Sequence, residues 1–340
     1  MFNIILLIAI PLFVYFVNNF FLKKKLIPNF SGSDHQKFFD NTKVPLSGGL
    51  FLCLLSIIIF FEVSNIFIIS FFLIFLLGFL SDTNFLSSVK WRFFFQSIII
   101  FFLIYNTQSN IQSIRINFID LYLQNFLISC LFTSFCMMIL VNGFNFIDGL
   151  NGLVISYFLI ILFFLFRLNS TELFFYGNIN LIFFIILLIT LLILNFLNNL
   201  YLGDSGSYLI GILTGYFMIL TYIKSPHISP YFIALLLWYP VFEILFSIIR
   251  KLKLKKSPFK PDNNHLHHLL FYYLEKRFYL KKNKANNISS LIIIFYNFVI
   301  FNFAFLNISY TYYHIVLMVM NILIYLLIYK KFWDFKSIKS

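Results

Sequence analysis

The segment NGFNFIDGLNG, residues 142–152, places polar side chains directly after a long apolar run. Its polar positions recur at every third residue: Asn142, Asn145, Asp148 and Asn151. On a helix this spacing would line them along one face. A helix cap needs only one such residue, so four in register indicate a functional surface. A carboxylate among amides is suited to hold a hard cation and to recognise a polar ligand.

A glycine-rich turn, LGDSGS at 202–207, is the second candidate segment. Gly203 and Gly206 flank Asp204 and Ser205 immediately before another apolar run. Small residues let the backbone approach an anion, and the N-terminus of the following helix favours negative charge. The carboxylate between them could hold a hard cation. The turn therefore predicts a phosphate or metal site.

Two further segments carry an acid and a group of histidines. Asp82 ends the apolar run GFLSD and is followed by Lys90, Arg92 and Gln96. Taken alone, such an acid is typical of a solvated helix end. The segment KPDNNHLHHLLF contains three histidines, namely His265, His267 and His268. A structural zinc site would need cysteines or further ligand pairs, so the surrounding basic residues favour anion binding.

The composition describes the elements that must position these residues. Of the 340 residues, 61% are hydrophobic and 11% are charged, whereas soluble domains carry about 25% charged residues. We expect an all-α integral membrane protein, a single polytopic domain over residues 1–340 with C-terminal helices at about 290–330. About eleven apolar segments are centred on Val14, Leu55, Leu73, Ile99, Leu131, Leu159, Ile186, Ile212, Leu236, Ile300 and Val319. Lysines 23–25 follow the first run instead of preceding it, which indicates a retained helix and not a signal peptide.

The distribution of charge orients this arrangement. Of the 25 Lys and Arg residues, 22 fall in loops on one side of the predicted membrane. The positive-inside rule makes that side cytoplasmic and places the N-terminus outside. The four candidate segments lie on the same side. Because lipid head groups and this rule explain the net charge of +13, nucleic acid is not an expected partner.

The motifs resemble those of the polyprenyl-phosphate N-acetylhexosamine-1-phosphate transferases, a glycosyltransferase family 4 type that includes phospho-N-acetylmuramoyl-pentapeptide transferase. The resemblance covers roughly residues 35–270, through VPLSGG (44–49), GFLSD (78–82), NGFNFIDGLNGL (142–153), LGDSGS (202–207) and HLHH (265–268). It implies transfer of a sugar 1-phosphate from a UDP-N-acetylhexosamine to undecaprenyl or another polyprenyl phosphate, with release of UMP. It also implies a multi-pass protein of the bacterial inner membrane, and a homodimer stays open.

The resemblance also implies roles for individual residues. It makes Asp204 a ligand of Mg²⁺, with Mn²⁺ as an alternative ion and Asn145 as an additional ligand. The implied catalytic residues are Asp82, Asp148, His267 and His268. The implied substrate-binding residues are Lys43, Asn142, Asn145, Asn151, Ser205 and His265.

Two positions depart from the family pattern. Many members have paired aspartates where this chain has Ser81 and Asp82, and many have Asp where this chain has Asn151. The first matters more, because the leading aspartate has been assigned as a base or a nucleophile. A phosphate monoester has a second pKa of about 6, so the acceptor is already mostly dianionic at neutral pH. We therefore expect direct attack by the lipid phosphate, with a covalent intermediate on Asp82 as the alternative.

Two alternatives to this activity remain at the level of sequence. The pentapeptide transferase typically has consecutive histidines, whereas Leu266 interrupts them here, a form that resembles the N-acetylglucosamine branch. A transporter or flippase would need ionisable residues near the bilayer midplane. The sequence offers mainly one such residue, the acid Glu243, which is expected well inside an apolar segment.

Overall fold

The computed structural model describes residues 2–24, 29–30, 44–59, 64–175, 177–258 and 262–339. These residues are predominantly helical, as the apolar runs predict. The helices are α1 (Phe2–Lys24), α2 (Gly48–Ile59), α3 (Asn65–Asp82), α4 (Val89–Thr107), α5 (Asn117–Leu123), α6 (Phe126–Ile147), α7 (Leu153–Arg167), α8 (Gly177–Phe196), α9 (Gly203–Lys224), α10 (Pro230–Leu236), α11 (Trp238–Lys253), α12 (Leu266–Phe278), α13 (Lys282–Phe305) and α14 (Thr311–Lys339). A 3₁₀ turn, η1 (Thr171–Leu173), and an antiparallel pair, β1 (Asn29–Phe30) with β2 (Val44–Pro45), complete the described elements.

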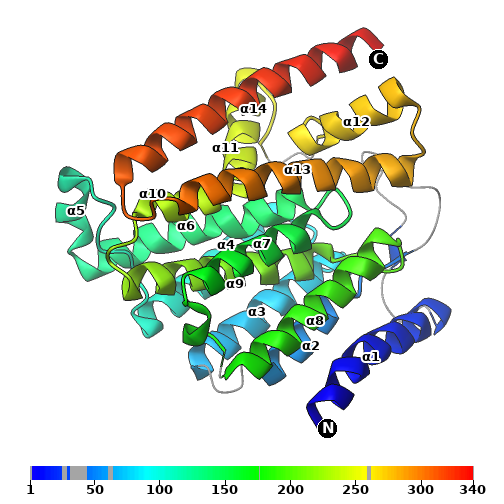
Figure 1. Ribbon diagram of the computed structural model, residues 1–340, viewed down its shortest axis with the longest axis horizontal. Coiled ribbons are helices and arrows are strands. Elements are labelled where there is room, and N and C mark those ends of the chain that lie inside the picture. The colour runs from blue at the N-terminus through cyan, green and yellow to red at the C-terminus, as the bar shows by residue number, and fades with distance from the viewer. Residues whose placement is uncertain are drawn as a thin grey trace.

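The helices form a bundle around α9. Most of the apolar stretch of α9 is buried, and it packs against α2, α3, α6 and α7. Gly211 makes close packing possible, because a Cβ there would lie 2.7 Å from the Cα of Val141 in α6. Helix α1 lies at the edge of the bundle beside α8, and α14 runs along the opposite edge (Figure 1). The chain thereby surrounds the N-terminal turn of α9 with the ends of other helices.

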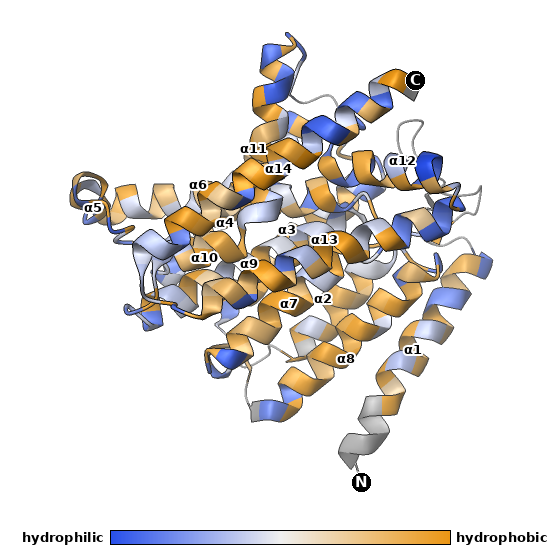
Figure 2. Ribbon diagram, turned by 45° about the horizontal axis from the view of Figure 1, so that its top comes forward, coloured by the Kyte–Doolittle hydropathy of each residue, from blue (hydrophilic) through white to orange (hydrophobic). Residues whose placement is uncertain are grey.

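The pattern of hydropathy is that of a membrane-spanning bundle. Within the described residues, seven helices are long and apolar enough to cross a membrane, or eight if the bent pair α10 and α11 counts as one span. Helices α2 and α7 are apolar but shorter. Hydrophilic residues gather toward the ends of the long helices, whereas hydrophobic residues cover their middles (Figure 2). All eleven predicted centres lie in helices. The protein is therefore an all-α, multi-pass membrane protein.

The ninth predicted segment, centred on Leu236, is not one continuous helix. Helices α10 and α11 meet there at 75°. Pro240 in the first turn of α11 lacks the N–H that would bond to the Leu236 carbonyl, and this breaks the helical hydrogen-bond ladder. The buried Tyr157 hydroxyl donates to that carbonyl instead, over 2.9 Å. The bend directs α11 past α6 and places Glu243 near α12.

Candidate active site

The turn that begins α9 is held by main-chain bonds to the VPLSGG segment. The Gly48 and Gly49 N–H groups donate to the carbonyls of Tyr201 and Leu202, over 3.0 and 3.1 Å. Gly203 adopts a positive φ of 74°, a conformation that favours glycine. A Cβ at Gly203 would also lie 2.7 Å from a carboxylate oxygen of Asp82. The glycines of both motifs therefore let the backbone and an acid approach closely.

Asp82 caps the N-terminus of α9. Its Oδ1 accepts from the Asp204 N–H over 2.8 Å, and its Oδ2 accepts from the Ser205 N–H over 3.1 Å. The Ser205 hydroxyl donates to the same Oδ2 over 2.7 Å. These bonds satisfy main-chain donors that a helix start leaves unpaired, and a carboxylate is favoured there by the helix dipole. Asp82 thus joins the end of α3 to the start of α9.

Asp204 is surrounded by donors from three other segments. Its Oδ2 lies 2.5 Å from the Arg92 Nη1 and also accepts from the Ser81 hydroxyl over 2.5 Å. Arg92 donates to Ser81 as well. The Asn145 amide donates to the other oxygen, Oδ1, over 2.7 Å. The side chain of Asp204 remains 28% exposed, so an ion or ligand can reach its carboxylate.

The NGFNFIDGLNG segment does not continue as one helix, which corrects the expectation of a single four-residue face. Helix α6 ends at Ile147, Asp148 is its C-cap, and α7 begins only at Leu153. Asn151 lies in the intervening turn, where its amide donates to the Asn198 side chain over 2.7 Å. The turn is possible because Gly152 adopts a φ of 73°. Polar positions before and after the break nevertheless face the same space.

Two adjoining cavities define that space. The first, about 400 Å³, is lined by Ser81, Asp82, Asp204 and Asn151 together with Tyr201. The second, about 280 Å³, has a more apolar wall. Its lining includes Val89, Phe93, Asn142, Phe146, Ile244, Ile248, Lys251, Asp262, His265 and His268. Both cavities are lined by Arg92, Asn145, Asp148 and Gly149. They therefore meet beside the pair formed by Arg92 and Asp204.

Asp148 lies where the cavities meet and is strongly perturbed. Burial raises its pKa well above the usual range for an aspartate, and the nearby charges of Asp204 and Asp82 raise it further. Like charges and desolvation both disfavour the ionised form of a carboxyl group. Three acids from α3, the end of α6 and α9 thus share one region. A bound cation would relieve their mutual repulsion.

The three predicted histidines occupy different environments. His265 lies between two acids, with Nδ1 3.1 Å from Glu243 and Nε2 3.6 Å from Asp262. His268 lines the second cavity. His267 is fully buried, and its Nδ1 lies 3.5 Å from the Tyr239 hydroxyl. His268 is thus placed beside the polar space, whereas His265 is held within an ion network.

His267 faces the turn that carries Asp148. A Cβ at Gly149 would lie 3.0 Å from the His267 Nε2 and would also collide with the His268 ring. The His267 Nε2 is buried and has no hydrogen-bond partner among the described residues. Burial lowers the pKa of His267 below its usual value, which favours a neutral imidazole. The histidine segment and the NGFNFIDGLNG turn are therefore packed against each other.

The donor set can be tested against a bound metal ion. Within the described residues no group of three or more His, Cys, Asp and Glu side chains is arranged to hold a metal. Mg²⁺ does not require such a cage, because it commonly binds one or two carboxylates plus water and substrate phosphates. Asp204 is exposed to the first cavity, and Asp148 lines the same cavity. These residues fit a Mg²⁺ ion that shares its ligands with a phosphorylated substrate.

Sequence reasoning overlooked two residues and named one outside the described structure. Arg92 and Glu243 receive no site role from the sequence, yet Arg92 pairs with Asp204 and Glu243 binds His265. The signal for Arg92 was its place in the polar stretch that follows Asp82, and for Glu243 its position in an apolar run. Lys43, an expected substrate contact, lies outside the described residues.

The fold and the site define a polytopic membrane protein with an acid-lined cavity at the ends of its helices. Residues 64–222 match the model of glycosyl transferase family 4. This match supports the family resemblance that the motifs predict. The VPLSGG and HLHH motifs lie outside the matched residues.

Curated relatives support the same family. Over 143 residues the chain is 32% identical to an undecaprenyl-phosphate alpha-N-acetylglucosaminyl 1-phosphate transferase of Thermotoga maritima. This alignment covers 38% of this chain and 39% of the relative. Proteins of the same name from Escherichia coli K12 and Yersinia pestis are 28% and 27% identical over 148 residues, 41% of this chain. These alignments span about two fifths of the length of each relative, 39% and 40% respectively.

Proposed function

We propose that the protein transfers a sugar 1-phosphate, N-acetylglucosamine 1-phosphate or that of a related N-acetylhexosamine, from a UDP-sugar to undecaprenyl or another polyprenyl phosphate. The observation that carries this proposal is the meeting of Asp82, Asp148 and Asp204 at two adjoining cavities. The first cavity is the more polar one, and the second has an apolar wall with a lysine and histidines. The names of the relatives support the same reaction class, and do not favour a transporter or the pentapeptide enzyme.

The two cavities fit the two substrates of such a reaction. A soluble UDP-sugar suits the first cavity, where amides, hydroxyls and Asp204 surround the space. A prenyl chain suits the apolar wall of the second cavity, formed in part by Phe93 and Ile248, with Lys251 as a cation for its phosphate. The shared residues, Arg92 among them, would then lie beside the phosphates that react. Lys251→Ala should raise KM for the lipid more than KM for the UDP-sugar.

We propose Mg²⁺ as the metal ion, held by Asp204 together with the substrate diphosphate, with Mn²⁺ able to replace it. When bound, the ion would offset negative charge on the diphosphate. Asn145 already touches Asp204, and turning its amide would present an oxygen to the same ion. Arg92 supplies a second positive charge at the same carboxylate.

Direct attack by the lipid phosphate is the mechanism that the geometry supports best. A phosphate oxygen of the acceptor attacks the β-phosphorus of the UDP-sugar, and the bond from that phosphorus to the bridging oxygen breaks to release UMP. Both oxygens of Asp82 already accept hydrogen bonds from the start of α9, which favours a structural cap over a nucleophile. The protein's contribution is positioning and charge stabilisation, the main terms in phosphoryl transfer.

The proposed location is the bacterial inner membrane with the site on the cytoplasmic face and the N-terminus outside. The distribution of Lys and Arg supports this orientation. In the structure, the three acids of the site and the three histidines lie at or next to helix ends. A cytoplasmic UDP-sugar and a membrane-bound acceptor could both reach such a site.

The direct test is release of UMP by the purified protein in detergent. The assay contains Mg²⁺, undecaprenyl phosphate and a panel of UDP-N-acetylhexosamines, and it is repeated without the lipid. We expect UMP only when the lipid is present, and the best donor names the sugar. Absence of UMP with every donor would overturn the proposal. A phosphosugar bound covalently to the enzyme after a pulse of UDP-sugar without lipid would overturn the direct mechanism.

A further inference from the structure

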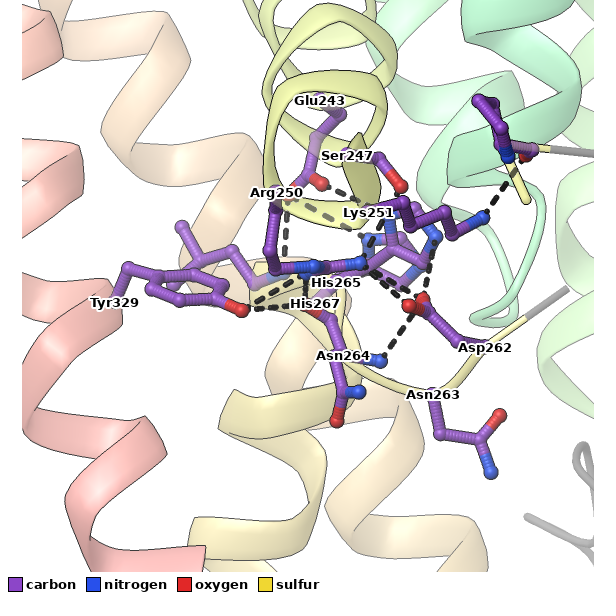
Figure 3. Close-up of polar contacts among 12 residues, drawn as sticks. Glu243, Ser247, Arg250, Lys251, Asp262, Asn263, Asn264, His265, His267 and Tyr329 are labelled. Carbon is purple, nitrogen blue, oxygen red and sulfur yellow. Dashed lines mark hydrogen bonds and ion pairs between the residues drawn. The ribbon is translucent and has the colours of Figure 1, made fainter. Parts of the chain in front are cut away.

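A network of charged and polar groups surrounds the histidine segment, residues 262–268. Glu243 and Arg250 reach it from α11, and Tyr329 reaches it from α14 (Figure 3). Helix α14 lies outside the part of the chain that matches the family. The network therefore connects the C-terminal helix of the protein to a segment that borders the second cavity.

Arg250 is the centre of this network. Its Nη2 lies 2.8 Å from each carboxylate oxygen of Asp262, and its Nη1 donates to the Asn264 carbonyl. The same Nη1 donates to the Tyr329 hydroxyl oxygen over 2.8 Å. Arg250 and Asp262 are largely buried, at 9% and 22% side-chain exposure. Such a charge-assisted contact fixes the position of its partner more firmly than an exposed pair does.

Helix α14 adds contacts to the main chain of the same segment. The Tyr329 hydroxyl donates to the Asn264 carbonyl over 3.0 Å. Lys336, two turns further along the helix, donates to the Asn263 carbonyl over 3.1 Å and to the Asn264 side-chain oxygen over 2.9 Å. Donors from α14 thus hold the two residues that immediately precede His265.

The contacts from α14 add to those that Arg250 and Glu243 of α11 make with the same segment. Residues 252–257 are exposed, and the segment enters α12 only at Leu266. Glu243 holds that entry point, since it accepts from the Leu266 N–H over 3.1 Å. A shift at Asn264 would be transmitted to His265 and to His268, which lines the second cavity. The position of the histidines therefore depends in part on how residues 263 and 264 are held.

We propose that Tyr329 and Lys336 are positioning residues of the active site, which act by holding Asn263 and Asn264 so that the histidine segment keeps its place beside the second cavity. We call these two residues and their contacts the C-terminal clamp. The proposal rests on the proposed function, because it assumes that the histidine segment contacts the phosphates of the substrates. It assigns to α14 a role in substrate binding.

The kinetic test uses two variants and two matched controls. Tyr329→Phe removes only the hydroxyl, and Lys336→Ala removes the ammonium group. Tyr313 lies at the other end of α14, and Tyr313→Phe removes a hydroxyl that donates to the Phe303 carbonyl of α13. Lys331→Ala removes an exposed lysine of α14. Full-length protein is assayed for UMP release with UDP-N-acetylglucosamine and undecaprenyl phosphate.

We expect each clamp variant to raise KM for at least one substrate about 5-fold, with kcat changed less than about 3-fold, because each variant loses the two hydrogen bonds of one side chain outside the chemical centre. The double variant should raise KM about 20-fold. The controls should leave both constants unchanged. A fall in kcat at unchanged KM, or kinetics identical to the wild type, would overturn the positioning role.

A second measurement separates the clamp from the proposed reaction. Trypsin can cleave after Lys253, Lys255 or Lys256, which lie in the exposed stretch before the histidine segment. We expect cleavage there to be about 5-fold faster in the clamp variants than in the controls, because the segment opens more often. If the wild-type protein shows no turnover but cleavage is faster in the clamp variants, the result would support the clamp. It would count only against the proposed function. Unchanged cleavage would overturn the clamp even if KM rose.

Discussion

The protein contains two polar regions that differ in how their charges are paired. At the start of α9, three acids share one space, and Arg92 is the cation that pairs with Asp204. Around the histidine segment, each acid has basic partners: Glu243 faces His265, and Asp262 faces Arg250. The first region carries excess negative charge beside a cavity, whereas the second is neutralised internally and largely buried.

This difference indicates which region carries the chemistry and which region positions the segment beside it. A site with unbalanced charge gains most from an added cation, because buried like charges repel strongly. A balanced and buried network gains little from an added cation but loses much if one partner is removed. We therefore expect substitutions in the first region to change chemistry and metal dependence. Substitutions in the second should change binding and stability.

The largest effect is expected for Asp204→Asn. This variant keeps the shape of the side chain but removes the charge proposed to hold Mg²⁺, so UMP release should fall by about 1,000-fold or more. Expression and thermal stability should stay close to the wild type. Asp334→Asn, which changes an exposed acid on α14, is the matched control and should retain full activity. Mg²⁺-dependent activity in Asp204→Asn would contradict the metal assignment.

Arg92→Ala should give the next largest loss. The guanidinium is the positive charge beside Asp204 and lines both cavities, so its removal should lower kcat/KM by about 100-fold. Lys90→Ala is the control, because Lys90 is exposed on the same helix. The Mg²⁺ concentration for half-maximal activity is measured for both variants. If Arg92 acted only in folding, thermal stability would fall and the remaining folded enzyme would keep its normal kcat/KM.

Asp204 and Arg92 show which parts of the site can be predicted from the sequence. The fold class and the approach of Asp82, Asp148 and Asp204 follow from apolar periodicity and from acids at the ends of apolar runs. The interruption at Pro240 was missed because the residues on both sides of the proline are apolar, and a proline near a helix start has no unique consequence. Arg92 was missed because partner choice depends on the packing of α4 against α3, which sequence spacing does not reveal.

Glu243→Gln should have an intermediate effect. The amide oxygen can still accept from the Leu266 N–H, but His265 loses the carboxylate that it contacts. We expect kcat/KM to fall about 20-fold, in the range seen when a residue that orients a ligand-binding side chain is changed. The melting temperature should also fall, as measured by a thermal shift in detergent. A loss of activity as large as that of Asp204→Asn would contradict the division between the two regions.

The smallest effect is expected for Ser81→Ala. This variant tests whether Ser81 does the work of the aspartate that many family members have at this position. Ser81 gives Asp204 one of its hydrogen bonds, whereas Arg92 and Asn145 supply others that the variant keeps. Loss of a single neutral donor should lower kcat/KM only about 3-fold. A fall of about 100-fold or more would instead show that the hydroxyl acts on the substrate, taking the place of the absent carboxylate. Since the acceptor phosphate is mostly dianionic at neutral pH, no base at position 81 is required for attack, and the near-neutral outcome is the one that direct transfer predicts.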